Sequence, residues 1–201
     1  MRHCSCDIPI RRAWAMPSAE TFSIPPIAEL LDRWLEGREV IVDPFARNSK
    51  RGTITNDLSS KTTARFSLES REFLRAMHAD QLSADAALLD PPYSPRQIKD
   101  CYEGVGMPVG QCETQHARLI SDVKDLLAPL VRPGGIVVTC GWNSQGMGRC
   151  RRFELREVLI VAHGGSHNDT IVTVEEKMPS LFDGFQGSAV AAEGARPAGE
   201  D

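Results

Sequence analysis

The feature that most constrains the fold is a series of short apolar runs, each ending in a polar or acidic residue. Runs of this kind are typical of strands that are buried on both faces of a parallel sheet. Amphipathic segments separate several of the runs, and strands that alternate with helices predict an α/β fold. The predicted strands span residues 40–42, 53–55, 66–68, 86–89, 135–140, 154–162 and 170–175.

Three segments have the spacing of amphipathic helices. In residues 27–36 the apolar side chains recur with a helical period, and Pro25 and Pro26 stand at the start, where a helix can do without backbone donors. We expect two further helices at 70–78 and 113–130, the second of which ends before a Pro-Gly-Gly terminator.

The connections between the predicted strands indicate how the sheet is arranged. The link from 40–42 to 53–55 is shorter than a parallel crossover that contains a helix, so it is a loop, or the second strand lies elsewhere. The last two strands are joined by the turn-rich segment 164–169 and should form an antiparallel pair. Together these features predict a mostly parallel, seven-stranded sheet with a C-terminal antiparallel hairpin.

Length and composition predict one domain. The chain has 201 residues, of which 41% are hydrophobic, which is enough for a single ordinary core. We expect an N-terminal arm or loop at 1–18, the domain at 19–178, and a disordered tail at 179–201, where Gly, Ala, Pro and Ser dominate without periodicity.

The sequence gives no sign of a membrane span, a signal peptide or a metal site. No apolar run approaches the roughly 18–20 residues that a span requires, so we expect a cytoplasmic protein. The six cysteines lack CxxC spacing. His3, Cys4 and Cys6 could form half of a metal site, but no second pair of ligands is evident, and we therefore expect no metal.

The net charge is −4, which argues against a protein that coats nucleic acid. About −3 of this charge lies in residues 181–201, so the predicted domain is nearly neutral. The placement of the basic residues therefore matters more than the total.

One short motif carries the chemistry. Asp90-Pro91-Pro92-Tyr93 directly follows the apolar run 86–89, which places it at the carboxyl edge of the sheet, where open α/β folds bind ligands. The prolines have no N–H and fix the local chain, so Asp90 and the Pro91 carbonyl present a rigid pair of acceptors. Such acceptors suit an amino group, and the ring of Tyr93 could stack on the base that carries it, a contact worth about 1–3 kcal/mol.

This tetrad resembles the signature of the S-adenosylmethionine-dependent DNA amino-methyltransferases, in which Asp, Asn or Ser precedes Pro-Pro-Tyr. The resemblance implies a Rossmann-like class I methyltransferase fold and a tetrad that grips a flipped-out base while its amine attacks the methyl group of S-adenosylmethionine. The string alone is also typical of a proline-stiffened surface turn. The implied catalytic residues are Asp90, Pro91, Pro92 and Tyr93.

The implied partner is DNA, and RNA is an alternative. Asp at the first position of the tetrad favours N6 of adenine over N4 of cytosine. Fewer than fifty residues separate the cofactor segment from the tetrad, with no insert long enough for a target-recognition domain. The chain therefore resembles the compact adenine methyltransferases of phages and prophages, which implies the cytoplasm of a bacterial or phage-infected cell.

Residues 40–46 resemble the family's cofactor-binding strand and turn, which implies contacts from Asp43, Pro44, Phe45 and Ala46. The family usually continues with Gly-any-Gly, whereas this chain has Ala46-Arg47-Asn48-Ser49. The missing glycines leave open a degenerate module that binds cofactor or nucleic acid without catalysis. A buried strand that ends in an Asp-Pro turn is the structural alternative.

Four further residues are implied to hold the cofactor. Asp57 lies where the family places a carboxylate on the ribose hydroxyls, and Glu69 where it often has an acid near the adenine. Phe22 and Ile24 lie in a segment that resembles the one that closes over the methionine end. The alternatives are helix-capping acids for Asp57 and Glu69 and a hydrophobic staple for the segment before the helix at 27–36.

Basic residues follow several of the predicted strands. If all of them lie at the carboxyl edge, they converge on the mouth of the pocket as phosphate contacts; the alternative is ordinary solvated charge. We also expect residues 94–110 to form a mobile loop over the target strand, and Trp142 either to line the pocket or to cap the core. The implied phosphate-binding residues are Arg47, Lys50, Arg51, Arg96, Lys99, Arg149, Arg151 and Arg152.

Overall fold

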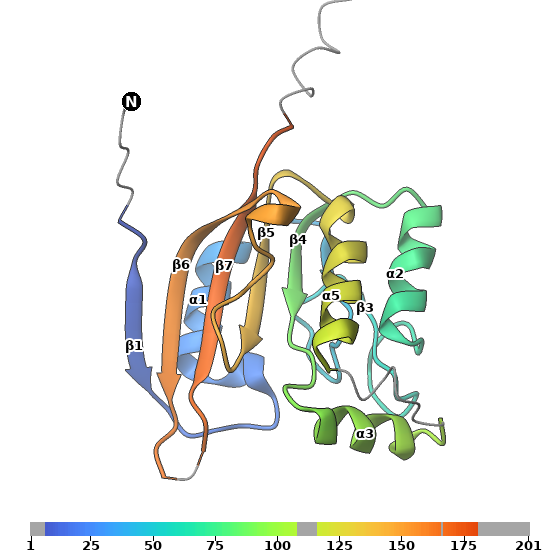
Figure 1. The fold of residues 1–201 in the computed structure, drawn as a ribbon, viewed down its shortest axis with the longest axis horizontal. Coiled ribbons are helices and arrows are strands. Elements are labelled where there is room, and N and C mark those ends of the chain that lie inside the picture. Colours follow the sequence, from blue (N-terminus) through green and yellow to red (C-terminus); the bar gives the residue numbers. More distant parts are fainter. Residues whose placement is uncertain (1–6, 108–115, 166, 181–201) are drawn as a thin grey trace, which may run out of the picture.

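The computed structural model describes residues 7–107, 116–165 and 167–180. In this part of the chain seven strands form one sheet in the order β1-β6-β7-β5-β4-β2-β3 (Figure 1). Every neighbouring pair is parallel except the two pairs that involve β7. The strands are β1 (Ile10–Trp14), β2 (Ile41–Asp43), β3 (Ile54–Thr55), β4 (Ala84–Leu89), β5 (Val131–Gly141), β6 (Phe153–Ala162) and β7 (Thr170–Lys177).

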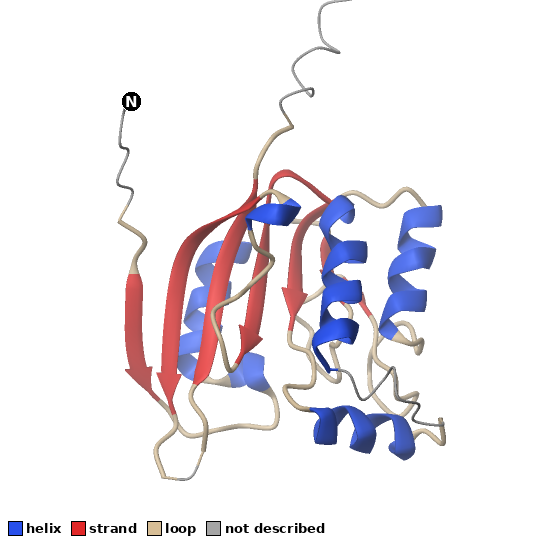
Figure 2. Cartoon of the chain, in the orientation of Figure 1, coloured by secondary structure: helices blue, strands red, loops and turns tan. Residues whose placement is uncertain are grey.

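Helices cover both faces of the sheet (Figure 2). One face carries α1 (Pro25–Leu35), and the other carries α2 (Ser70–Ala79) and α5 (His116–Leu127). A fourth helix, α3 (Pro95–Gly104), follows β4 and lies beyond its carboxyl end, below α5 and α2 in Figure 1. This layered mixed sheet with its C-terminal antiparallel pair confirms the predicted Rossmann-like α/β fold.

The core consists of two apolar clusters, one on each side of the sheet. Successive residues of β4 point to opposite faces, so Ala86 and Leu88 pack with α1 while Ala87 and Leu89 pack with α2 and α5. All four are fully buried, which explains why β4 reads in the sequence as a continuous apolar run. Parallel strands covered on both faces hold the site rigidly at their ends.

The seventh strand differs from the one predicted. Residues 66–68 contribute only an isolated bridge between Phe66 and Asn56. The sheet gains β1 instead, inside the segment predicted to be an arm or loop, and β1 pairs in parallel with β6. Four of its five residues are exposed, so its apolar pattern does not mark it as a strand, and backbone pairing with β6 holds it in the sheet.

The loop predicted at 94–110 begins with a helix. Ser94 caps α3 by accepting a hydrogen bond from the backbone N–H of Gln97 at 3.2 Å, and Pro95 takes the first helical position. The prediction of a mobile loop is therefore wrong for residues 95–104. The connection between β2 and β3 is a loop without a helix, as the short link required.

Some predictions lie outside the described residues. These include the start of the helix predicted at 113–130, the tail from 181 onward, and the possible metal ligands His3, Cys4 and Cys6. None of the helices that the structure describes is both long enough and apolar enough to cross a membrane.

Candidate active site

The strand order reverses between β2 and β4. From β2 the chain proceeds to β3 on one side, and from β4 it proceeds to β5 on the other, so a crevice opens at the carboxyl ends of this pair. A cavity of about 630 Å³ occupies this position, within the range of small-molecule sites. Asp43 ends β2 and Asp90 follows β4, so both acids lie at this edge.

The cavity brings the tetrad together with half of the predicted cofactor residues. Its walls include Asp90, Pro91, Pro92 and Tyr93, together with Pro44, Phe45, Asp57 and Glu69. The other four predicted cofactor residues do not line it. Phe22, Ile24 and Ala46 are buried apolar side chains, and Asp43 is fully buried.

Within the tetrad, the hydroxyl of Tyr93 donates a hydrogen bond to Oδ1 of Asp90. Burial raises the pKa of Asp90, and hydrogen bonds from Tyr93 and Thr21 and the charge of Arg47 oppose that rise. Burial and the neighbouring Asp90 raise the pKa of Tyr93, so its phenol stays protonated as a donor. The backbone N–H of Tyr93 bonds Oε1 of Gln97 on α3 at 2.5 Å, which fixes the end of the tetrad.

An aromatic neighbour stands beside the tetrad. The rings of Tyr93 and Trp142 meet edge to face, with centroids 5.7 Å apart and an interplanar angle of 61°. Trp142 directly follows β5 and is 43% exposed, so it does not cap the core, and it is not among the residues that line the cavity. The sequence indicated this position but could not show that the two rings touch.

The turn after β2 contains a left-handed backbone conformation, although it lacks the glycines that usually adopt one. Arg47 has φ of +50°, a left-handed conformation that glycine adopts without strain. Its backbone N–H bonds Oδ2 of Asp57 at 3.2 Å, which ties the turn to the end of β3. The glycine-poor sequence therefore still forms a tight turn at the cavity wall, with the Arg47 side chain on it.

Asp43 is the buried acid behind this turn. Its Oδ1 accepts a hydrogen bond from the backbone N–H of Phe45 at 3.1 Å, while its Oδ2 has no partner among the described residues. Burial raises the pKa of Asp43 strongly, although the Phe45 bond opposes the rise, and the charges of Asp90 and Asp57 add to it. Burial therefore favours the protonated form of Asp43.

Asp57 and Glu69 each combine a structural role with a place in the cavity wall. Asp57 accepts hydrogen bonds from the backbone N–H groups of Arg47 and Ser59. Glu69 caps α2 by accepting from the backbone N–H of Arg71 at 2.9 Å, and it accepts from the hydroxyl of Tyr102 at 3.1 Å. The capping alternative is thus observed for Glu69, and its carboxylate also borders the cavity.

The predicted phosphate-binding residues do not all share one edge. Arg47 lines the cavity, and Arg96 and Lys99 are exposed on α3 beside it. Lys50 and Arg51 border a separate hollow next to α1, where Arg51 bonds Asp32.

The prediction that Arg149, Arg151 and Arg152 lie at the carboxyl edge is wrong. Because β6 runs in the same direction as β5, the chain must return to the amino edge after β5, and these arginines directly precede β6.

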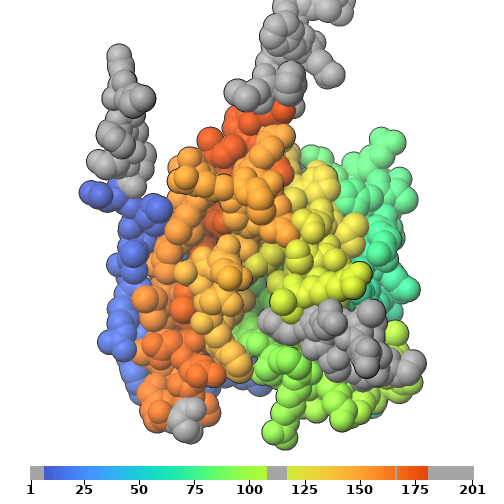
Figure 3. All heavy atoms as spheres, viewed as in Figure 1, coloured from blue at the N-terminus to red at the C-terminus, as the bar shows by residue number. Residues whose placement is uncertain are grey.

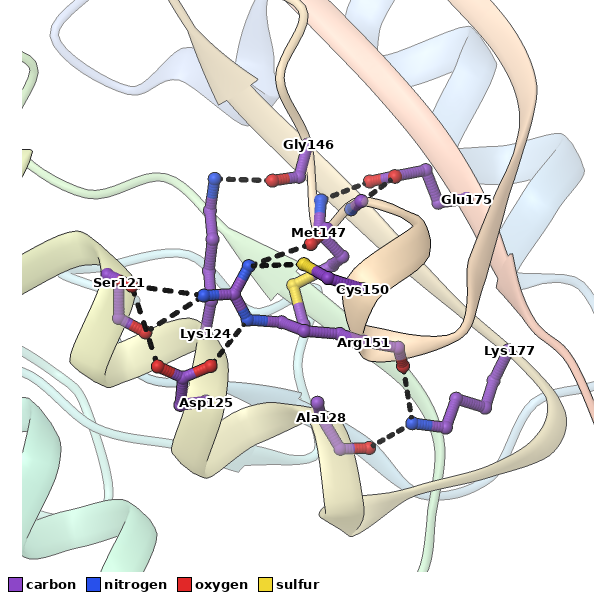
Figure 4. A network of polar contacts seen from close by, with 11 residues as sticks. Ser121, Lys124, Asp125, Ala128, Gly146, Met147, Cys150, Arg151, Glu175 and Lys177 are labelled. Atoms are coloured by element: carbon purple, nitrogen blue, oxygen red, sulfur yellow. Dashed lines mark hydrogen bonds and ion pairs between the residues drawn. The ribbon is translucent and has the colours of Figure 1, made fainter. Parts of the chain in front are cut away.

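Polar contacts hold this returning segment against the sheet (Figure 4). Glu175 on β7 accepts from the backbone N–H of Gly148 at 2.9 Å and from that of Met147. Lys124 on α5 donates to the carbonyl of Gly146, and Arg151 pairs with Asp125 at 2.8 Å. Arg151 therefore has a structural partner far from the cavity.

No protein-family model and no curated protein matches the sequence. Solved structures resemble it at low identity. TrmN from Thermus thermophilus matches with a TM-score of 0.49 and 22% identity, over 77% of this chain and 49% of its own. NSun6 from Pyrococcus horikoshii with SFG matches with a TM-score of 0.49 and 15% identity, over 75% of this chain and 51% of its own. An rRNA methylase from Streptococcus thermophilus matches with a TM-score of 0.43 and 12% identity, over 75% of this chain and 93% of its own.

The chain thus spans about half the length of the first two structures. With identities of 22% or less and TM-scores below 0.5, these similarities do not assign the chain to a family. The substrates of these proteins carry no argument for this chain.

Proposed function

We propose that this protein transfers a methyl group from S-adenosylmethionine to the exocyclic amine of a nucleic-acid base, with N6 of adenine in DNA as the target. The observation that carries the proposal is the position of Asp90-Pro91-Pro92-Tyr93 in the wall of a cavity at the reversal point of the sheet. A surface turn with the same letters would have no cavity and no second wall of acids.

The residues of the cavity fit this cofactor. Asp57, Glu69, Asp90 and Asp100 line it, and Arg47 is the one basic side chain among its described lining residues. A mainly acidic pocket favours a cationic ligand, and a sulfonium carries such a charge. When bound, S-adenosylmethionine supplies an electrophilic methyl group on that sulfonium.

We propose that the carboxylate of Asp57 accepts hydrogen bonds from the ribose hydroxyls of the cofactor. The adenine would lie on the side of the cavity that Glu69 borders. The backbone bonds that Asp57 accepts hold it in place, and a carboxylate retains lone pairs for further donors. Pro44 and Phe45 supply the apolar wall between the turn and the tetrad.

Asp90 and the carbonyl of Pro91 are proposed to accept hydrogen bonds from the two N–H groups of the target amine. The exocyclic nitrogen is a poor nucleophile because its lone pair is delocalised into the ring, and fixed acceptors stabilise the positive charge that it acquires during transfer. Asp90 orients and polarises the amine, and the proton leaves after transfer. Tyr93, with Trp142 against it, offers the aromatic surface for the base.

The target base must leave its stack to reach Asp90, because the carboxylate is half-buried in the cavity. Arg96 and Lys99 on α3 are exposed beside the opening and are the proposed phosphate contacts, with Arg47 nearer the cavity. The distribution of charge in the structure favours this set over the arginines of the amino edge.

The test is mass spectrometry of nucleosides from cells that express the protein, with Asp90→Ala as the matched control. We expect N6-methyladenine in digested DNA from the parent and not from the variant. N4-methylcytosine, or methylated nucleosides confined to RNA, would reassign the substrate. The absence of any new methylated nucleoside, together with no binding of S-adenosylmethionine in calorimetry, would refute the proposal.

A further inference from the structure

The exposed apolar side chains gather on one edge strand. Ile8, Ile10, Trp14 and Met16 account for four of the seven large hydrophobic residues that are exposed in the described part of the chain. Ile10 and Trp14 lie at the two ends of β1 and share one face of it, with Arg12 between them, while Ile8 and Met16 flank the strand at the same two-residue spacing. Ile10, Trp14 and Met16 are each at least 66% exposed, which is unusual for a stripe of this length on an isolated protein.

The backbone of the same strand is open on one side. β1 ends the sheet and forms the outer margin of the molecule (Figures 1 and 3). Val158 N–H bonds the Pro9 carbonyl at 2.9 Å, and Ala15 N–H bonds the Ala162 carbonyl at 3.1 Å, so odd-numbered residues pair with β6. The N–H and C=O groups of Ile10, Arg12 and Trp14 therefore face outward and can pair with another strand.

We propose that two copies of this chain associate by antiparallel pairing of β1 with β1, with Ala13 on the twofold axis. In this register Ile10 lies opposite Met16 of the second copy, and Arg12 lies opposite Trp14 of the second copy. The outward-facing residues then form the hydrogen-bonded pairs, as the direction of their backbone groups requires. A twofold interface is self-complementary, and this strand meets that condition.

Charge selects this register over its neighbour. Centring the pair on Arg12 would place two arginines directly opposite each other, which is unfavourable. Centring on Ala13 places each guanidinium beside an indole ring, where a cation–π contact is favourable. Arg12 makes no hydrogen bond or ion pair with the other residues that the structure describes, so its charge is available for this contact.

The strand is short, so the buried area falls below that of a standard stable interface, and the dimer should be weak and dependent on concentration. The proposed catalytic tetrad and cavity belong to one chain. The association is therefore independent of the proposed function, and either can fail alone.

The first test is sedimentation velocity of the full chain over a range of concentrations, with circular dichroism to verify folding. We expect a monomer–dimer equilibrium in the parent that Trp14→Ser weakens by about tenfold or more. Trp142→Ser, which removes an exposed tryptophan at the end of the interior strand β5, should leave the equilibrium unchanged. A parent that remains monomeric at its solubility limit, or equal effects of the two variants, would overturn the proposal.

The second test fixes the register by disulfide trapping. Ala13 would form a non-hydrogen-bonded pair on the axis, with Cα atoms about 4.5 Å apart, which permits a disulfide. We expect Ala13→Cys to form a covalent dimer on mild oxidation, and Arg12→Cys and the parent, which carries the other cysteines, to form far less. Crosslinking of Arg12→Cys in preference to Ala13→Cys, or of neither in folded protein, would contradict this pairing.

Discussion

The hydroxyl of Tyr93 donates a hydrogen bond to the carboxylate of Asp90, three residues before it in the chain. The ring proposed to stack on the base and the acid proposed to hold its amine are therefore coupled. Asp90 retains lone pairs for an amine, because a carboxylate accepts about four hydrogen bonds. A change at Tyr93 should thus alter the chemistry of Asp90 as well as the aromatic surface.

Tyr93→Phe separates these two effects, because it removes the hydroxyl and keeps the ring. The bond from Tyr93 lowers the pKa of Asp90 against the larger effect of burial, so its loss raises that pKa further. Since the ionised carboxylate is the proposed acceptor, methyl transfer is lost as pH falls through the pKa of Asp90, and the acid limb of the pH–rate profile should move to higher pH. Tyr93→Ala should in addition raise KM. If the acid limb does not move in Tyr93→Phe, the ionisation of Asp90 does not determine it.

Arg47→Gly tests the strained turn after β2. A non-glycine residue at positive φ is destabilised by roughly 1–2 kcal/mol, partly offset by the greater freedom of glycine in the unfolded chain. Compared with Arg47→Ala, which loses the same charge but keeps the strain, Arg47→Gly should be more stable by up to about 1 kcal/mol in denaturant unfolding. Equal stabilities of the two variants would show that the turn relaxes without glycine.

The sequence predicts much of this fold because the relevant signals are local. The apolar run that became β4 and the helical spacing of α1 each reflect burial on a fixed face. The Pro133-Gly134-Gly135 sequence predicted the end of the preceding helix and lies at the start of β5, where Pro133 and Gly134 are exposed. β1 could not be predicted in this way, since Ile10–Trp14 is held by backbone pairing with a strand about 150 residues away and buries little apolar surface.

The site was predictable to the extent that it follows strand ends. Asp90 directly follows β4, Asp57 comes two residues after β3, and both line one cavity, as expected for the carboxyl ends of parallel strands. Arg151 was misplaced because its position depends on the direction of β6, which the alternating pattern of a strand does not specify. Ser94-Pro95 is a typical start of a helix, and it does begin α3. The Gly and Pro residues further along favoured the prediction of a loop instead.

Glu157 ties the edge of the sheet to α1. It is 4% exposed and accepts hydrogen bonds from Trp34 at 2.8 Å and Arg11 at 2.8 Å, and from Arg33 at 3.0 Å. Burial raises the pKa of Glu157, but these three hydrogen bonds outweigh it and hold the pKa below its usual value. The ionised state is thus favoured in the folded protein.

A folded pKa below the unfolded one gives stability that is present above the unfolded pKa and is lost as pH falls through the folded pKa. Glu157→Gln should therefore lower stability near neutral pH by about 1–3 kcal/mol, and the difference from the parent should shrink in acid. Thermal unfolding as a function of pH measures the stability of both proteins, with Glu154→Gln as the control because the Glu154 side chain is on the same strand but is 42% exposed. A difference that does not change with pH would assign the effect to packing.

Asp90 provides the direct test of the proposed chemistry, because its work is on the target amine and not on the cofactor. Asp90→Ala should bind S-adenosylmethionine about as well as the parent and lose methyl transfer by on the order of a hundredfold or more, if removing one well-aimed polar group costs about 3 kcal/mol. Asp90→Asn keeps an acceptor oxygen but loses the charge and adds a donor. Partial activity in Asp90→Asn would favour an orienting role, and complete loss would favour charge stabilisation. Full activity in Asp90→Ala at saturating cofactor, measured by nucleoside mass spectrometry, would remove Asp90-Pro91-Pro92-Tyr93 from the mechanism.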